Sequence, residues 1–247
     1  MLLRRISSFV GLITLLSLFF FAEGAALPIA SAQTSACADR ASQPGEQLLA
    51  LQVGESERDY LQFLPTAYDG STPLPVVVVM HGFTDNVRGI RDDSQFNAVA
   101  EANDFIVVYP QGQGFPPRWN NGISAFQPND NTRDVDFLWT LVAHLDETLC
   151  IDSSRVYVSG FSAGGGMAHR AACELSDIFA AAGTVSGAYS DIPGGCNPTR
   201  PVPIITLHGS DDRIVPYTGD DSGMQWLPDI SQWTAEWAAR NQCDETP

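Results

Sequence analysis

The stretch VYVSGFSAGGG, Val156 to Gly166, decides the fold and points to a chemistry. Val156–Ser159 has the apolar pattern of a buried strand, and a helix is predicted to start at Gly164. Residues 160–164, GFSAG, fit G-x-S-x-G, a strained turn whose glycines let a serine hydroxyl rise at the carboxyl edge of a sheet. A phosphate-binding glycine turn is the alternative, but the chain has neither a lysine nor the G-x-x-x-x-G-K pattern. We therefore expect Ser162 to be a nucleophile.

The rest of the chain predicts an α/β domain around this turn. Apolar, valine-rich runs predict buried strands, and a loose alternation near the start predicts a hairpin. The expected strands are Glu46–Val53, Arg58–Leu64, Leu74–Met80, Phe105–Tyr109, Val156–Ser159, Ala180–Val185 and Pro203–Leu207, and the expected helices are Ser94–Ala102, Arg133–Leu149, Gly164–Leu175 and Asp229–Asn241. Because strands alternate with helices, we expect a mostly parallel sheet with helices on both faces.

The first 32 residues are expected to be a secretory signal peptide rather than part of the fold. A basic start, MLLRR, precedes an apolar run, and Ala30-Ser31-Ala32 offers a cleavage site before Gln33. An uncleaved membrane anchor is the alternative, since the apolar run is near the short end of spanning length. Residues 33–247 then form one extracellular domain with no membrane partner.

The net charge and the cysteines indicate which partners, disulfides and metal sites to expect. The formal net charge is −16, which makes nucleic acid and anionic membrane unsuitable partners. The five cysteines predict disulfides after export, with one thiol left over, but their pairing cannot be read from the sequence. Since no C-x-x-C pair or cysteine–histidine cluster occurs, we expect no metal site.

Two further parts of an acyl-transfer site can be placed. After the strand ending at Met80, the N–H of Phe83 is expected to hold an oxyanion together with the N–H of Ala163. His81 in the same loop is interpreted as structural. The acid is expected after a later strand, where Asp211 and Asp212 compete.

Several motifs carry a resemblance to a known family. They are RDYLQFLP from Arg58, VVMHGF from Val78, RWNNG from Arg118, DVDF from Asp134, CIDSSRVYVSGFSAGG from Cys150, LHGSDDRIVPY from Leu207 and WAARNQC from Trp237. Together the chain resembles the secreted α/β-hydrolase esterases of the polyhydroxybutyrate depolymerase-like and feruloyl esterase-like group. The resemblance implies ester hydrolysis through an acyl-enzyme without a cofactor, and it selects Asp212 as the acid.

The general base is missing from the expected place. This fold orders its triad serine, acid, histidine, yet none of the 35 residues after Asp212 (247 − 212) is a histidine. His169 lies seven residues beyond Ser162 on one helix, about 10 Å along it, which is too far for direct proton transfer. His144 lies on another helix, and His208 is the least unsuitable substitute. We expect a C-terminally incomplete domain that folds poorly and has little activity.

Three functions compete on these grounds. The first is a serine esterase acting on feruloyl or acetyl esters of plant polysaccharide, or on polyhydroxyalkanoate polyester. Trp119, Tyr217 and Trp226 could bind an aromatic ring or a sugar, although buried packing is the alternative for each. The second is a non-catalytic secreted binding or scaffold protein that retains the turn. The third is a serine peptidase, because a triad alone does not distinguish amides from esters.

Overall fold

In the computed structural model, the described residues are Cys37, Arg40 and the segments 43–122, 133–192, 194–221 and 227–244. The predicted signal peptide and Trp226 lie outside them. The chain divides by its contacts into two units, Met1–Ser31 and Ala32–Pro247, and the described residues all lie in the second. Among its described residues, no helix is both long enough and apolar enough to cross a membrane.

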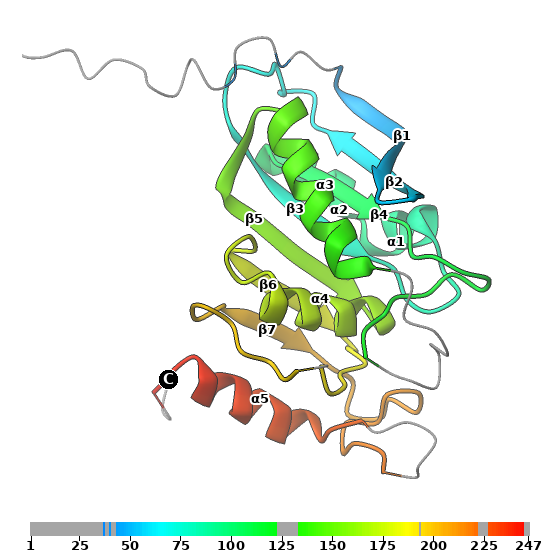
Figure 1. Ribbon diagram of the computed structural model, residues 1–247, viewed down its shortest axis with the longest axis vertical. Helices are drawn as coiled ribbons and strands as arrows, with labels where there is room; N and C mark the ends of the chain where they lie inside the picture. The colour runs from blue at the N-terminus through cyan, green and yellow to red at the C-terminus, as the bar shows by residue number, and fades with distance from the viewer. Residues whose placement is uncertain are drawn as a thin grey trace, which may run out of the picture. The chain divides into compact units, whose positions relative to one another are not determined.

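Seven strands form one mixed sheet in the order β1-β2-β4-β3-β5-β6-β7 (Figure 1). Their bounds are β1 Gly45–Val53, β2 Ser56–Leu64, β3 Leu74–Met80, β4 Ile106–Pro110, β5 Ile151–Phe161, β6 Ala181–Val185 and β7 Ile204–Leu207. β1 and β2 form the predicted hairpin, and β2 pairs with β4 antiparallel. All pairings from β4 through β7 are parallel. The predicted α/β class with a mostly parallel sheet is confirmed.

Helices cover the sheet unequally on its two faces. Their bounds are α1 Val87–Ser94, α2 Phe96–Asn103, α3 Asp134–Thr148, α4 Ala163–Glu174 and α5 Ile230–Arg240. One face packs against α3, α4 and α5, and this packing forms the large core, which includes Val78, Leu141 and Trp237 (Figure 1). The other face packs against α1 and α2 in a smaller cluster that includes Val79 and Ile90.

The helices α1 and α2 leave part of their face of the sheet uncovered. Phe161, at the end of β5, and Val185, at the end of β6, are exposed, and on β7 the exposed fractions are 65% for Ile205 and 59% for Leu207. β7 has β6 as its one partner among the described strands. Among the described residues, the sheet edge at β7 is therefore apolar on one face and has no strand paired along its outer side.

The predicted elements differ from the observed ones in two places. The region around Ser94 holds two short helices that meet at Gln95, which has a left-handed φ of 56°. The predicted helix Ser94–Ala102 crosses this junction and misses α1. β5 also begins at Ile151, five residues before the predicted start, because a polar first half pairs with β3 through an irregular register.

Candidate active site

Ser162 occupies a tight turn between β5 and α4. Its φ of 53° and ψ of −117° lie outside the regions that an L-residue ordinarily adopts. A Cβ atom on Gly160 would come within 2.3 Å of the Gly164 backbone, and one on Gly164 within 2.3 Å of the Met80 carbonyl oxygen. Only glycine fits at either flank, so the predicted role of both glycines has a direct steric cause.

Backbone hydrogen bonds hold Ser162 in this unfavourable conformation. Its N–H donates to the Val185 carbonyl at 2.9 Å, and its carbonyl oxygen accepts from Gly166 and Ala188, both at 3.0 Å. Its hydroxyl has no hydrogen-bond partner among the described residues, and the side chain is half-buried. Because Ser162 stands at the N-terminus of α4, the helix dipole favours negative charge beside it.

The two predicted oxyanion donors flank this serine. Ala163 is the first residue of α4, where helical N–H groups have no partner within the helix. Gly82 adjoins the turn, since a Cβ atom on it would lie 3.5 Å from the Ser162 Cβ. The loop after β3 therefore brings Phe83 to the same edge of the sheet, as the sequence predicted. The role of the two N–H groups stays a prediction.

His81 fixes the shape of that loop. Its Nδ1 lies 2.7 Å from the Gly82 carbonyl oxygen, and its Nε2 accepts from the Gly112 N–H at 2.9 Å. Burial lowers the pKa of His81, although the bond to Gly82 opposes the shift, so the ring is neutral at neutral pH. With both nitrogens engaged, His81 has the surroundings of a structural residue.

Trp119 and Tyr217 differ in their availability to a ligand. Trp119 is 1% exposed, and its indole N–H donates to the His81 carbonyl at 2.9 Å. The prediction that Trp119 contributes to a substrate-binding surface is therefore corrected. Its position supports the alternative, buried packing. Tyr217 is half-buried, and its ring lies 6.0 Å from the His208 ring in an edge contact.

Asp212 follows β7 and is held by its own turn. Its Oδ1 accepts from the N–H groups of Ile214 and Val215, both at 2.9 Å. Burial opposes ionisation of this carboxyl, but the hydrogen bonds from Val215, Ile214 and Ser186 and the nearby His208 outweigh it. The pKa of Asp212 is therefore below its ordinary value, and the group is an anion at neutral pH. Its neighbour Asp211 is exposed.

His208 lies beside this acid but is turned away from it. Its Nε2 is 2.7 Å from the Val215 carbonyl oxygen and 3.8 Å from the Asp212 Oδ2. The first contact is a hydrogen bond and the second is too long for one. The Nδ1 of His208 is buried without a hydrogen-bond partner.

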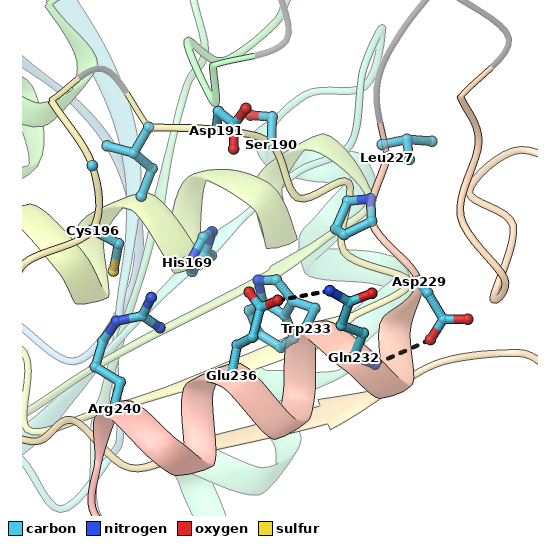
Figure 2. Close-up of a pocket in the computed structure, with 13 residues that line it drawn as sticks. His169, Ser190, Asp191, Cys196, Leu227, Asp229, Gln232, Trp233, Glu236 and Arg240 are labelled. Carbon is cyan, nitrogen blue, oxygen red and sulfur yellow. Dashed lines mark hydrogen bonds between the residues drawn. The ribbon is translucent and has the colours of Figure 1, made fainter.

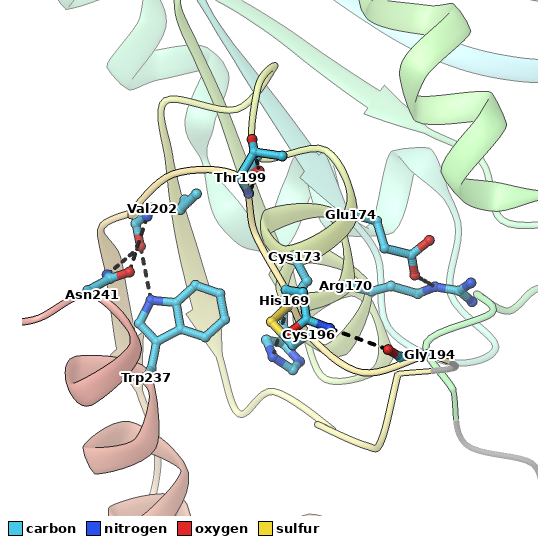
Figure 3. The surroundings of a disulfide bond; sticks show 12 residues. His169, Arg170, Cys173, Glu174, Gly194, Cys196, Thr199, Val202, Trp237 and Asn241 are labelled. Atoms are coloured by element: carbon cyan, nitrogen blue, oxygen red, sulfur yellow. Dashed lines mark hydrogen bonds and ion pairs between the residues drawn. A yellow bond between two sulfur atoms is a disulfide. The ribbon is translucent and has the colours of Figure 1, made fainter.

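The remaining histidines are engaged elsewhere. His169 is buried against the Cys173–Cys196 disulfide, with its Nε2 3.6 Å from the Cys173 sulfur (Figure 3). Burial, helped by Arg240, lowers the pKa of His169 to about 3. His144, on α3, makes an edge contact with Tyr60. No hydrogen bond joins any of the four histidines to Ser162.

The cysteines form two disulfides, Cys37–Cys150 and Cys173–Cys196, and Cys243 is free and exposed. This confirms that one of the five is left over. One trio in the described chain, His169 with Cys173 and Cys196, has ligand atoms close enough together for a metal ion. Two of those atoms are the bonded sulfurs, so they are not available as thiolate ligands.

Comparisons with known proteins identify the family of this chain. The family described as "Putative esterase" matches residues 52–245. Feruloyl esterase B of Piromyces equi is 30% identical over 193 residues, 74% of this chain and 35% of that protein. A bifunctional acetylxylan esterase/xylanase of Neocallimastix patriciarum is 28% identical over 160 residues, 65% of this chain and 22% of that protein. The chain therefore spans much less than the full length of these relatives.

A solved structure supports the fold independently. A ferulic acid esterase of Anaeromyces mucronatus superposes with a TM-score of 0.55 at 17% identity, over 82% of this chain and 81% of that one. At this identity the likeness concerns the fold. With the strand order above, it establishes the predicted α/β-hydrolase fold.

Proposed function

This chain belongs to the esterase family, and from that premise we propose that it carries the nucleophile and acid of a secreted serine carboxylic ester hydrolase. The observation that carries the proposal is the strained Ser162, held at φ 53° at the head of α4 by glycines that no other residue can replace. Strain of this kind persists where the surrounding structure enforces it, and it often marks a functional site.

The proposed chemistry follows from the positions of the groups. The Ser162 oxygen attacks the ester carbonyl carbon while a base takes its proton. The resulting oxyanion accepts hydrogen bonds from the N–H groups of Ala163 and Phe83. Collapse expels the alcohol, which receives that proton, and water then cleaves the acyl-enzyme by the same steps. Asp212 orients the base and stabilises its protonated form.

The base itself is not among the four histidines at their present positions. His81 and His169 are buried and engaged, His144 faces Tyr60, and His208 donates to Val215. We therefore expect the 247-residue chain alone to hydrolyse esters on the order of 10⁴-fold or more below a complete triad enzyme. The same observation favours the second candidate, a secreted binding protein that retains the turn without catalysis.

For the substrate, we propose feruloyl or acetyl esters of plant polysaccharide. The support is that the matched relatives are named feruloyl esterase and acetylxylan esterase. Polyhydroxyalkanoate polyester is the alternative substrate, because the sequence motifs also resemble those of polyhydroxybutyrate depolymerase-like esterases. Two disulfides agree with an oxidising compartment outside the cytosol, as does the predicted signal peptide over residues 1–32.

Covalent labelling tests the nucleophile without requiring turnover. A fluorophosphonate is incubated with the chain in the presence of added imidazole, which can take the serine proton, and the labelled peptide is identified by mass spectrometry. We expect the adduct on Ser162, no adduct in Ser162→Ala, and unchanged labelling in Ser154→Ala, a matched exposed serine on β5. Equal labelling of wild type and Ser162→Ala would remove the nucleophile from the proposal. Hydrolysis rates with methyl ferulate, an aryl acetate and polyhydroxybutyrate are then compared under conditions in which the protein turns over, and the comparison ranks the substrate classes.

A further inference from the structure

A cavity whose lining does not include Ser162 lies between α4, α5 and the loop after β6 (Figure 2). Its volume is about 430 Å³, which is within the range of small-molecule sites. Its lining residues include His169, Ser190, Asp191, Trp233, Glu236 and Arg240. Nothing in the proposed mechanism uses this space.

Rigid elements build the inner wall of this cavity. The Cys173–Cys196 disulfide ties the loop after β6 to α4. Trp233 of α5 stacks on Tyr189 with ring centroids 3.7 Å apart and an interplanar angle of 2°. The His169 ring meets Trp233 edge-on at 5.1 Å. The cavity is therefore preformed, which lowers the entropic cost of binding a ligand there.

Polar groups with unused hydrogen-bonding capacity face the same cavity. The Arg240 guanidinium lies over the Trp237 ring at 5.3 Å and forms no ion pair with any described carboxylate. Glu236 accepts one hydrogen bond, from Gln232 at 2.9 Å, so other lone pairs remain free (Figure 2). Asp191 makes no hydrogen bond to a described residue, which adds another acceptor to the cavity.

His169 adds a buried polar atom at the base of the cavity. The residue is 6% exposed, and its Nε2 faces the Cys173 sulfur at 3.6 Å. Its Nδ1 makes no hydrogen bond to any described residue. Because the ring is neutral, this nitrogen can form a hydrogen bond with a hydroxyl group in either tautomer, whereas it offers an anion no positive charge.

The mixture of these groups identifies the ligand class. Asp191, Asp229 and Glu236 outnumber the single Arg240, so the cavity disfavours an anion. The guanidinium of Arg240 makes the cavity less favourable for a cation than the carboxylates alone would. A neutral ligand with many hydroxyl groups can donate to the carboxylates and His169, accept from Arg240, and lay its C–H surface on the apolar wall.

The cavity also lies beside the nucleophile. His169 is seven residues beyond Ser162 on α4, about 10 Å along the helix. Ser190 donates to the Asn121 carbonyl oxygen, and the Asn121 amide donates to the Ala188 carbonyl oxygen at 3.1 Å. Ala188 in turn donates its N–H to Ser162 at 3.0 Å. A short series of hydrogen bonds therefore links the rim of the cavity to the Ser162 turn, which supports a polymer that contacts both.

We propose that this cavity binds a neutral sugar unit of the polysaccharide, next to the unit whose ester reaches Ser162. The link to the ester rests on the proposed function, but binding in the cavity does not need Ser162 to react. Its polar contacts come from Arg240, Glu236, Asp191 and the Nδ1 of His169.

Calorimetric titration with unesterified xylotetraose tests the proposal on the full chain, with tryptophan fluorescence as a second readout. We expect saturable binding, weakened about tenfold in Arg240→Gln and in Glu236→Gln, since each removes a charge-assisted hydrogen bond. Both residues are exposed, so both variants are expected to fold. Arg155→Gln on β5 is the matched control and should bind as wild type does.

Each other outcome has a definite meaning. No saturable binding, or binding that neither cavity variant weakens, overturns the proposal. Tighter binding of spermine than of xylotetraose, lost in Glu236→Gln, replaces the sugar with a cation and also overturns it. Ser162→Ala should bind xylotetraose unchanged. Xylotetraose binding without any labelling of Ser162 would therefore defeat the proposed esterase and leave the sugar site standing.

Discussion

The nucleophile Ser162 and the acid Asp212 differ in how firmly the surrounding fold holds them. Ser162 lies just after the end of β5, which pairs with β3 on one side and β6 on the other, and both the backbone N–H and the carbonyl oxygen of Ser162 are hydrogen-bonded. Asp212 follows β7, whose one described partner is β6. The serine side is enforced by central strands and steric contacts, whereas the acid side depends on one short turn at a sheet edge.

This difference shows which part of the chemistry the described structure supports by itself. A strained nucleophile needs many surrounding contacts, and Ser162 has them. An acid needs a base to orient, and the histidine beside Asp212, His208, donates to Val215 instead. The predictions below contrast the two sides directly.

The largest effect is expected from Gly164→Ala on the serine side. The new Cβ atom would lie 2.3 Å from the Met80 carbonyl oxygen, and backbone cannot move aside cheaply. We expect the free energy of unfolding to fall by about 3 kcal/mol or more. Gly209→Ala, on the acid side, is the control, because its nearest neighbour would be 3.9 Å away. Urea denaturation of both variants measures the contrast, and equal losses would contradict it.

A smaller effect is expected from threonine substitutions in the sheet. Val158, on central β5, is 1% exposed, whereas Ile205 on β7 is 65% exposed. Val158→Thr buries a hydroxyl group and should lower the free energy of unfolding by about 2 kcal/mol. Ile205→Thr keeps a β-branched residue and should change it by less than about 0.5 kcal/mol.

Urea denaturation measures the free energies of unfolding of Val158→Thr and Ile205→Thr. Light scattering on heating gives a second measurement on the same two variants. Ile205→Thr makes the open face at β7 more polar, so we expect less aggregation than in wild type. If Ile205→Thr were as destabilising as Val158→Thr, the face at β7 would not be exposed in solution.

The smallest effect concerns the charge of Asp212. Its folded-state pKa is lower than the ordinary value of about 3.9, so its contribution to stability is present above that pH and is lost as the pH falls through the folded-state pKa. Wild type should therefore exceed Asp212→Asn by about 1 kcal/mol or less near pH 7, and the gap should close below about pH 4. Asp211→Asn, at the exposed neighbour, is the matched control and should leave the free energy of unfolding near pH 7 unchanged within about 0.5 kcal/mol.

Much of the fold was predictable because its signals are local. The valine run of β3 has the bounds predicted for it, and the G-x-S-x-G pattern placed Ser162 at the turn that the structure shows. The helix α1 was missed because its sequence, VRGIRDDS, is short and mostly polar with two buried residues. The early start of β5 was missed because its first half, IDSSR, is polar.

The site was predictable only in part, since some of it depends on tertiary contacts. Sequence order and motif placed Phe83, Ala163 and Asp212 at the carboxyl edge of the sheet, where the structure has them. The burial of Trp119 and the pairing of Cys173 with Cys196 depend on segments far apart in the chain. The cavity at His169 had no sequence signal, because its residues come from α4, α5 and a loop.

The central claim is that Ser162 is a working nucleophile whose base is not one of the histidines in these 247 residues. Hydrolysis of an aryl acetate by the full chain, measured with increasing added imidazole, tests it most directly. We predict a rate near background without imidazole and a rise with imidazole beyond its own reaction, absent in Ser162→Ala and reduced in Asp212→Asn. A normal enzymatic rate without imidazole that is lost in His208→Gln would contradict the claim.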